Sequence, residues 1–182
     1  MYADSKRVQA HTRAFLVLSH AEIESYLESW AKEITRSCES VWKAANRVTK
    51  PLAFLLVSIS ERIEAGQTLS ETKGKDVPTR LEESARRLFE KHYTQVKNNH
   101  GIKEKNFWSL LGPLGVPVTA LPSTLLPNLD SLGEIRGQHA HQSIKAVASV
   151  LDPETEYKRV SDLVDELKTF DEWIAKYKHA IR

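Results

Sequence analysis

The sequence predicts an all-α protein, a helical bundle of about five helices with one long proline-rich loop at about residues 111–127. Three observations lead to this prediction. Apolar residues recur every three to four positions over long stretches, which is the period of an amphipathic helix. No glycine or proline interrupts the first such stretch, residues 11–46. With 41% hydrophobic and 27% charged residues, the chain can bury its own core, so we expect one domain over residues 1–182.

The N-terminal half predicts three helices. The first covers about residues 11–46, with apolar residues at helical spacing. The second begins at Pro51 and ends at Gly66; it is apolar on nearly every side, which predicts a central helix covered by its neighbours. The third follows the T-x-x-E capping box of Thr79 and Glu82 and has a regular apolar stripe.

The C-terminal half predicts the loop and two further helices. Four prolines exclude a regular helix from the loop, and a loop this long and apolar is expected to pack against the protein. A short helix beginning near Leu125 leads into the stretch "GEIRGQHAHQS", and the last helix starts with Asp152 as its cap and Pro153 in its first turn. The last helix carries the most regular apolar stripe: Tyr157, Val160, Val164, Leu167, Phe170, Ile174, Tyr177 and Ile181.

Composition excludes several classes of protein. The one cysteine, Cys38, rules out an internal disulfide framework, and a polar start without a signal segment predicts a cytoplasmic protein. The longest apolar runs are too short to cross a bilayer, so no membrane association is expected. A net charge of +2 does not by itself indicate nucleic-acid binding. Neither a glycine-rich phosphate loop nor a G-x-S-x-G nucleophile motif is present.

A line of polar residues interrupts the first helix. His20, Glu24 and Glu28 follow one another at intervals of one helical turn. Such a line can border a site or orient a catalytic group. It can also be a solvated face or an i,i+4 pair worth roughly 0.2–0.5 kcal/mol, and we favour this second interpretation.

The stretch "GEIRGQHAHQS" places one arginine and two histidines within six residues, Arg136, His139 and His141. A metal site built on the two histidines lacks a convincing third ligand. A catalytic pair is chemically reasonable, because histidine moves protons near neutral pH and the arginine fork holds two phosphate oxygens. The third interpretation is a helix end whose cations complement the helix dipole. Composition alone favours a functional site and a purely structural helix end about equally.

Residues Arg136 to His141 match the R-x4-H motif of the HEPN superfamily. The first helix, "RAFLVLSHAEIESYLESWAKEI", resembles that of the HEPN group associated with RiboL-PSP proteins. The motif also stands where this family has it, late in a helical domain and just before a final long helix. The resemblance therefore covers most of the chain.

The resemblance implies a metal-independent endoribonuclease that acts on RNA as a homodimer, without a cofactor, often as a toxin or defence effector. It implies that His141 is the general acid and base and that Arg136 holds the scissile phosphate, giving 2′,3′-cyclic phosphate and 5′-OH ends. Gln138, His139, His20 and Glu24 are candidate supporting residues. An antitoxin or a nucleotidyltransferase is a candidate partner. The alternative is an inactive HEPN module that binds RNA, nucleotide or a partner protein.

Two features depart from the family pattern. Gly137 stands where the family usually has a polar residue, and His139 stands where an apolar residue is more common. Residues five apart in an ideal helix are also ~140° apart around its axis, so Arg136 and His141 do not share a face. We therefore expect either a distorted helix near Gly137 or a pair arranged across a dimer. Gly133 and Gly137 share one face, where another backbone can approach closely.

Overall fold

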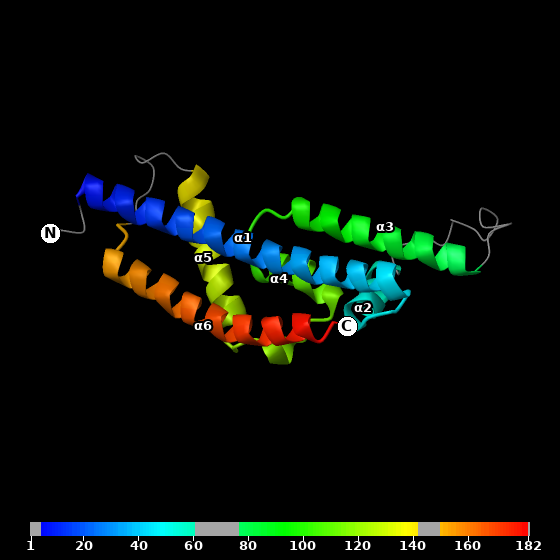
Figure 1. Cartoon of the computed structure of the whole chain (residues 1–182). Helices are drawn as coiled ribbons and strands as arrows, with labels where there is room; N and C mark the ends of the chain where they lie inside the picture. The colour runs from blue at the N-terminus through cyan, green and yellow to red at the C-terminus, as the bar shows by residue number, and fades with distance from the viewer. Residues whose placement is uncertain (1–4, 61–76, 142–149, 182) are drawn as a thin grey trace. The chain divides into compact units, whose positions relative to one another are not determined.

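The computed structural model describes residues 5–60, 77–141 and 150–181, and all regular structure in these ranges is helical, which confirms the all-α prediction (Figure 1). None of the described helices is both long and apolar enough to cross a membrane. The elements are α1 (Lys6–Ala45), α2 (Lys50–Ser60), α3 (Val77–Lys97), α4 (Glu104–Leu111), the 3₁₀ turns η1 (Gly112–Leu114) and η2 (Val118–Ala120), α5 (Leu125–His141) and α6 (Pro153–His179).

The chain divides into two compact units, which we describe separately. The first unit consists of Met1–Leu27, His100–Phe107 and Val118–Ile174. The second unit consists of Glu28–Asn99, Trp108–Pro117 and Ala175–Arg182. The helices α1, α4 and α6 contribute residues to both units.

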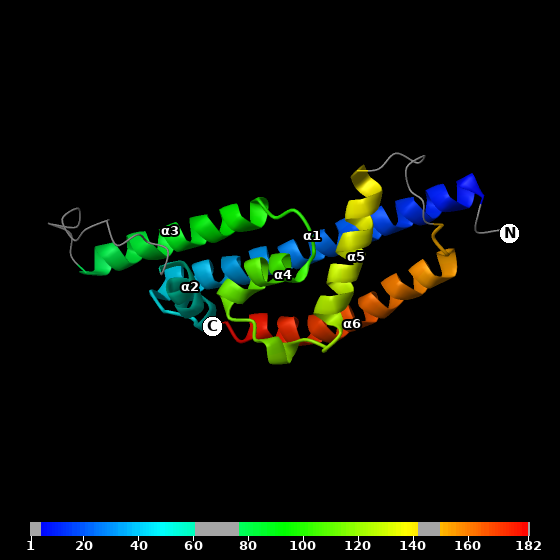
Figure 2. The same cartoon turned by 180° about the vertical axis from the view of Figure 1, so that it is seen from behind.

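In the first unit, the N-terminal part of α1 lies beside α6, and the two helices run in the same direction (Figures 1 and 2). The ring of Phe15 stacks on that of Tyr157 with 6.3 Å between centroids, and the Tyr26 hydroxyl donates a 2.9 Å hydrogen bond to Asp171. The helix α5 crosses this pair on one side and buries its leucines against it. Fully buried side chains of the unit include Leu16, Phe107, Leu125, Leu129, Leu132, Leu163 and Phe170.

The start of α6 forms as its sequence predicts. The carboxylate of Asp152 accepts a 3.0 Å hydrogen bond from the backbone N–H of Thr155, so it caps the helix, and Pro153 is the first helical residue. The preceding backbone is held by Gln9 of α1, whose side-chain amide both donates to and accepts from the backbone of Leu151. These contacts fix where α6 begins against α1.

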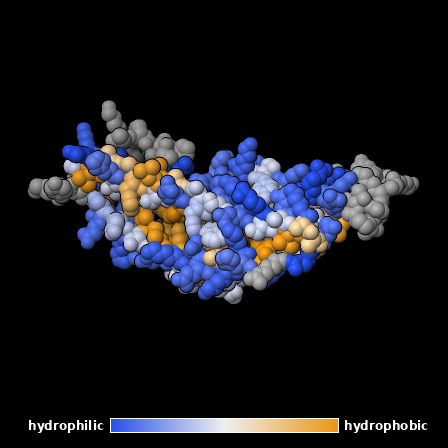
Figure 3. Space-filling model, viewed as in Figure 1, coloured by the Kyte–Doolittle hydropathy of each residue, from blue (hydrophilic) through white to orange (hydrophobic). Residues whose placement is uncertain are grey.

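The apolar stripe of α6 is only partly buried. Val160, Leu167 and Phe170 are buried, but Tyr157 is 65% exposed and Val164 is 38% exposed. Figure 3 shows apolar surface over this part of α1 and α6. Part of the apolar stripe of α6 is therefore not covered by the described residues of the first unit.

In the second unit, α3 runs antiparallel to the C-terminal part of α1. Glu28 accepts a hydrogen bond from Asn99 at one end of the pair, and Glu39 accepts a 3.0 Å hydrogen bond from the Tyr93 hydroxyl further along. The turn η1 packs on α2 and ends at Gly115, whose φ of 79° lies in the left-handed region. A Cβ at that glycine would lie 2.4 Å from the Phe54 ring, so both conformation and space require glycine there.

Two predictions about the N-terminal half are wrong. Leu52 and Leu55 of α2 are buried, but Phe54 is 43% exposed and Val57 63% exposed, so α2 is not a covered central helix. The composition of α2 is apolar on all sides. Among the described residues, however, the elements that pack on α2 cover one face of it. The helix α3 begins at Val77, so Thr79 lies inside the helix and does not precede it as a capping residue would.

The proline-rich segment is also more ordered than a loop. Its first residue, Leu111, ends α4, a helix that the sequence analysis did not predict. Two 3₁₀ turns follow, and α5 already begins at Leu125. Pro127 is the third residue of α5, where proline is tolerated because the first N–H groups of a helix have no intrahelical partner.

Candidate functional site

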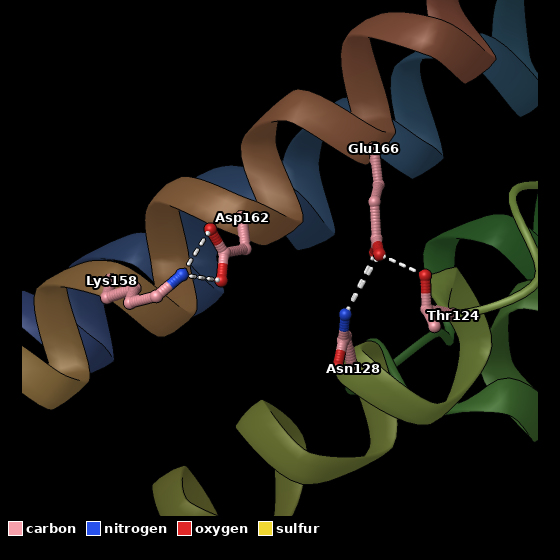
Figure 4. Close-up of polar contacts among 5 residues, drawn as sticks. All are labelled: Thr124, Asn128, Lys158, Asp162 and Glu166. Atoms are coloured by element: carbon pink, nitrogen blue, oxygen red, sulfur yellow. Dashed lines mark hydrogen bonds and ion pairs between the residues drawn. The ribbon is translucent and has the colours of Figure 1, made fainter.

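The motif helix α5 is anchored at its N-terminal end to α6. The carboxylate of Glu166 accepts hydrogen bonds from the Thr124 hydroxyl and from the Asn128 amide, the latter at 3.0 and 3.1 Å (Figure 4). One turn further along α5, Ser131 accepts a 2.6 Å hydrogen bond from Arg159, which is itself held by an ion pair with the buried Glu156. The nearby ion pair of Lys158 and Asp162 joins residues of α6 alone and lies on its surface (Figure 4). These contacts hold the N-terminal end of α5, the helix that carries Arg136 and His141, against α6.

The helix α5 continues without a break through Gly137 to His141. A distortion at Gly137, one of the two arrangements expected from the sequence, is therefore not observed. In a regular helix Arg136 and His141 are ~140° apart around the axis. Arg136 is half-buried, whereas the side chains of Gln138, His139 and His141 lie outside the described residues.

His20 of α1 is buried, with 4% of its surface exposed. Its Nδ1 lies 3.7 Å from a carboxylate oxygen of Glu24. Burial lowers the pKa of His20 below its usual 6.5; the charge of Glu24 raises it, and the positive charge of Arg136 lowers it further. A solvated face is wrong for His20, which is buried, whereas the i,i+4 contact with Glu24, the other part of the favoured interpretation, is observed. The structure brings Arg136 into electrostatic reach of the His20–Glu24 pair.

Glu24 is held in place from a distant part of the chain. Its second carboxylate oxygen accepts a hydrogen bond from the backbone N–H of Gly101. That glycine has a φ of 134°, a conformation that side-chain-bearing residues rarely adopt. Glu28, the third residue of the polar line, belongs to the second unit and pairs with Lys32 at 3.1 Å. Of the three polar residues, His20 and Glu24 therefore belong to the first unit and Glu28 to the second.

Lys103 is a cation near α5 that the sequence analysis did not single out. A Cβ placed on Gly133 would lie 2.9 Å from Cγ of Lys103, so the lysine stem lies directly on that glycine. Its Nζ is 3.6 Å from Glu134. The close approach expected at Gly133 is thus made by a side chain and not by a backbone. Gly137 differs, because no described atom lies within 4 Å of a Cβ placed there.

Two other reactive residue types have structural roles. His92 is fully buried in the second unit, with Nε2 3.0 Å from the carbonyl oxygen of Leu110 and Nδ1 2.8 Å from the Thr35 hydroxyl. Because a carbonyl only accepts, Nε2 donates to Leu110. Cys38 is fully buried, and burial raises the pKa of its thiol to about 11. It is unreactive at neutral pH, as its sequence context indicated.

Over the described parts of the chain, no group of three or more His, Cys, Asp or Glu residues is placed to hold a metal ion. The metal site considered for His139 and His141 falls on side chains outside those parts. It stays an untested alternative.

The family comparison covers both the site and the fold. The family model described as RiboL-PSP-HEPN matches residues 2–176, which include α1, α5 and most of α6. The chain belongs to this HEPN family. The comparison with curated proteins and that with solved structures found no match. Membership of a HEPN family indicates a nuclease-type, RNA-related function at the level of the family.

Proposed function

We propose that this HEPN domain is a metal-independent endoribonuclease that uses Arg136 and His141. The observation that carries the proposal is the position of Arg136. Its charge acts on His20, a buried histidine of α1. An arginine whose charge acts on a buried histidine, on the helix that carries the family motif, supports a site for a phosphodiester.

The chemistry needs two proton transfers and one cation. The 2′-oxygen of the RNA attacks phosphorus while its proton passes to a neutral histidine, which acts as general base. The bond from phosphorus to the 5′-oxygen breaks, and a protonated histidine gives that oxygen a proton. The products are a 2′,3′-cyclic phosphate and a 5′-OH. Arg136 neutralises the charge that develops on the phosphate oxygens.

A homodimer would supply both histidines. Within one chain the regular α5 directs Arg136 and His141 to different faces. Two copies of α5 that face each other would bring the arginine of one and the histidine of the other to a shared phosphate. This arrangement gives the proposed site one general base and one general acid. An RNase built in this way that attacks cellular RNA would arrest growth, and we propose a toxin or defence role on that basis.

His20 and Glu24 have a positioning role in this proposal. His20 stays neutral at pH 7 because burial and Arg136 both lower its pKa. A neutral ring does not compete with the phosphate for the charge of the arginine. Glu24, fixed by the N–H of Gly101, limits how far that pKa falls.

The test is cleavage of a structured RNA in EDTA by the wild type and by Arg136→Ala and His141→Ala. We expect both variants to lose at least ~10²-fold in rate, since general acid–base catalysis alone contributes 10²–10⁴-fold. Arg86→Ala and His179→Ala are matched controls, because both side chains are exposed and lie on other helices. Circular dichroism and gel filtration must show folded variants of unchanged size.

Three outcomes would contradict the proposal. Cleavage that EDTA abolishes would indicate metal-dependent catalysis. A metal that copurifies with the wild type but not with His139→Ala would assign the metal site to the two histidines. Cleavage that persists in both motif variants would indicate another site or a contaminant. A wild type that is monomeric at assay concentration and still fully active would exclude the shared site.

Gly137 favours a second candidate, an inactive HEPN module that binds RNA, nucleotide or a protein. The family usually has a polar residue there, and the space beside this glycine is open. If the missing side chain is what limits activity, Gly137→Asn should fit without a clash and raise the cleavage rate. Gly137→Ala is the control, because it stabilises the helix by about 1 kcal/mol without adding a polar group. Equal rates for both variants would show that the polar group is not what is missing.

A further inference from the structure

Residues 22–26 of α1 and residues 164–172 of α6 border an open groove of about 630 Å³ on the first unit. Its floor is made by Ile23 and Leu167, which are 5% and 7% exposed. Its walls include Tyr26 and Val164. The groove is therefore apolar at its base and open to solvent above.

Exposed apolar side chains continue from the groove toward the N-terminal ends of both helices. Leu18 of α1 and Tyr157 of α6 are each 65% exposed, and Phe15 stacks on that tyrosine. Figure 3 shows orange, hydrophobic residues grouped over this part of α1 and α6, with paler residues among them. Single exposed apolar residues are ordinary, but a continuous patch is typical of a binding surface.

The surface has the dimensions of a helix-binding groove. The paired positions Phe15–Tyr157 and Tyr26–Asp171 mark its ends, and 11 residues of α1 between them rise ~16 Å, or about three turns. A helix lying along this length would place apolar residues i, i+3 or i+4, and i+7 in the groove.

The charged residues that line the groove indicate which kind of partner would bind there. The groove is lined by three carboxylates, Glu22, Asp171 and Glu172, against one ammonium group, Lys168. An acidic border disfavours RNA. It also disfavours a second copy of the chain, because a symmetric contact would set the same carboxylates against each other. A helix with apolar residues on one face and lysine or arginine on its flanks fits both the floor and the border.

The groove is distinct from the proposed ribonuclease site. On the α1 wheel, Glu22 is ~200° from His20, so the two residues lie on opposite faces. In Figure 1 α5 passes behind α1, and the apolar area in Figure 3 is seen from the front in the same view. We propose that this groove docks a basic amphipathic helix of a partner protein, on the face of α1 away from α5.

The probe is a fluorescein-labelled peptide of about 15 residues, with leucines at helical spacing on one face and lysines elsewhere. Its control has the same composition with the leucines distributed around the helix. Fluorescence anisotropy with the full chain measures both. We expect the amphipathic peptide to bind at least ~10-fold more tightly than the control peptide, because only it fills the apolar floor.

A pair of matched variants locates the binding. Val164→Asp places a charge in the groove wall and should weaken binding by ~10-fold or more. Val118→Asp is the same substitution at a residue that is 64% exposed and does not line the groove, and it should bind as the wild type does. Both sites are at least 38% exposed, so neither change should unfold the protein.

A charge exchange tests the identity of the partner. The double variant Glu22→Lys/Glu172→Lys should reverse the preference, binding a glutamate-flanked peptide better than the lysine-flanked one. Equal binding of the amphipathic and control peptides, or equal effects of the two valine variants, would overturn the proposal. So would a dimer that Val164→Asp dissociates, because the occupant would then be a second copy. RNA cleavage is measured separately, so this proposal and the ribonuclease proposal can fail independently.

Discussion

Among the residues that the structure describes, each unit buries one histidine, and the two histidines differ in what surrounds them. His92 has both ring nitrogens within hydrogen-bond distance of oxygen atoms, at 2.8 and 3.0 Å. His20 has a carboxylate at 3.7 Å, longer than a hydrogen bond, and an arginine whose charge acts on it. Burial lowers the pKa of both rings, so burial does not distinguish them. The charged neighbours of His20 do, and on this basis we propose a structural role for His92 and a functional role for His20.

The largest expected effect is on stability at the histidine of the second unit. His92→Ala should reduce the free energy of unfolding by about 3 kcal/mol, because it leaves a cavity and removes two hydrogen bonds from the core. His20→Ala should cost less, about 1 kcal/mol, because no close hydrogen bond to Glu24 is lost. Urea unfolding followed by circular dichroism measures both. Equal losses would remove the distinction between the two sites.

The two substitutions should affect the rate of RNA cleavage in the opposite order, with the larger loss at His20. His20→Ala should slow RNA cleavage by ~10-fold, because Arg136 then loses the neutral ring that borders it. His92→Ala, assayed at a temperature where it is folded, should cleave at the wild-type rate. Single-turnover rates at saturating enzyme concentration test this pair. A slow His92→Ala enzyme with a normal fraction folded would contradict the assignment.

Both histidines should make stability depend on pH in the same direction. Each has a folded pKa below the unfolded value of 6.5, so the unfolded chain binds more protons as pH falls. The stabilisation is complete above pH 6.5 and is lost as pH falls below it toward the folded pKa. His20→Gln and His92→Gln should each flatten the slope of the unfolding free energy between pH 7 and pH 5. A slope unchanged in both variants would show that neither pKa is lowered.

The smallest expected effect is a pKa change at one histidine alone. Glu24→Gln removes the charge that raises the pKa of His20 and keeps an oxygen to accept the N–H of Gly101. The pKa of His20 should therefore fall further, and that of His92 should not change. An NMR titration of the ring resonances follows both. A shift at His92 would mean that the substitution disturbs the second unit.

The comparison also shows what the sequence can predict. The all-α fold and the cap of the last helix followed from local signals, since the Asp152 carboxylate and the N–H of Thr155 are three residues apart. Helical periodicity predicted which face of α6 is apolar. It did not predict that Tyr157 and Val164 stay exposed, because exposure depends on which element lies opposite. The same reason accounts for α2, whose apolar composition could not show that Phe54 and Val57 stay exposed.

The candidate site was predicted in part. The motif on α5 was found from its residue types and spacing. The burial of His20 was missed because the helix that covers it lies more than a hundred residues further along the chain. Lys103 was missed because no motif contains it, although a glycine at position 133 already indicated a close approach. Long-range packing decides these points, and local patterns do not encode it.

The central claim is that His20 and Arg136 share one site for RNA. The most direct measurement is an NMR titration of the histidine rings with a 2′-O-methyl RNA oligonucleotide, which has no free 2′-OH and so cannot be cleaved by this route. The account predicts that the His20 resonances move and those of His92 do not, and that Arg136→Ala abolishes the movement. RNA binding that leaves His20 unchanged, or that Arg136→Ala does not weaken, would contradict it.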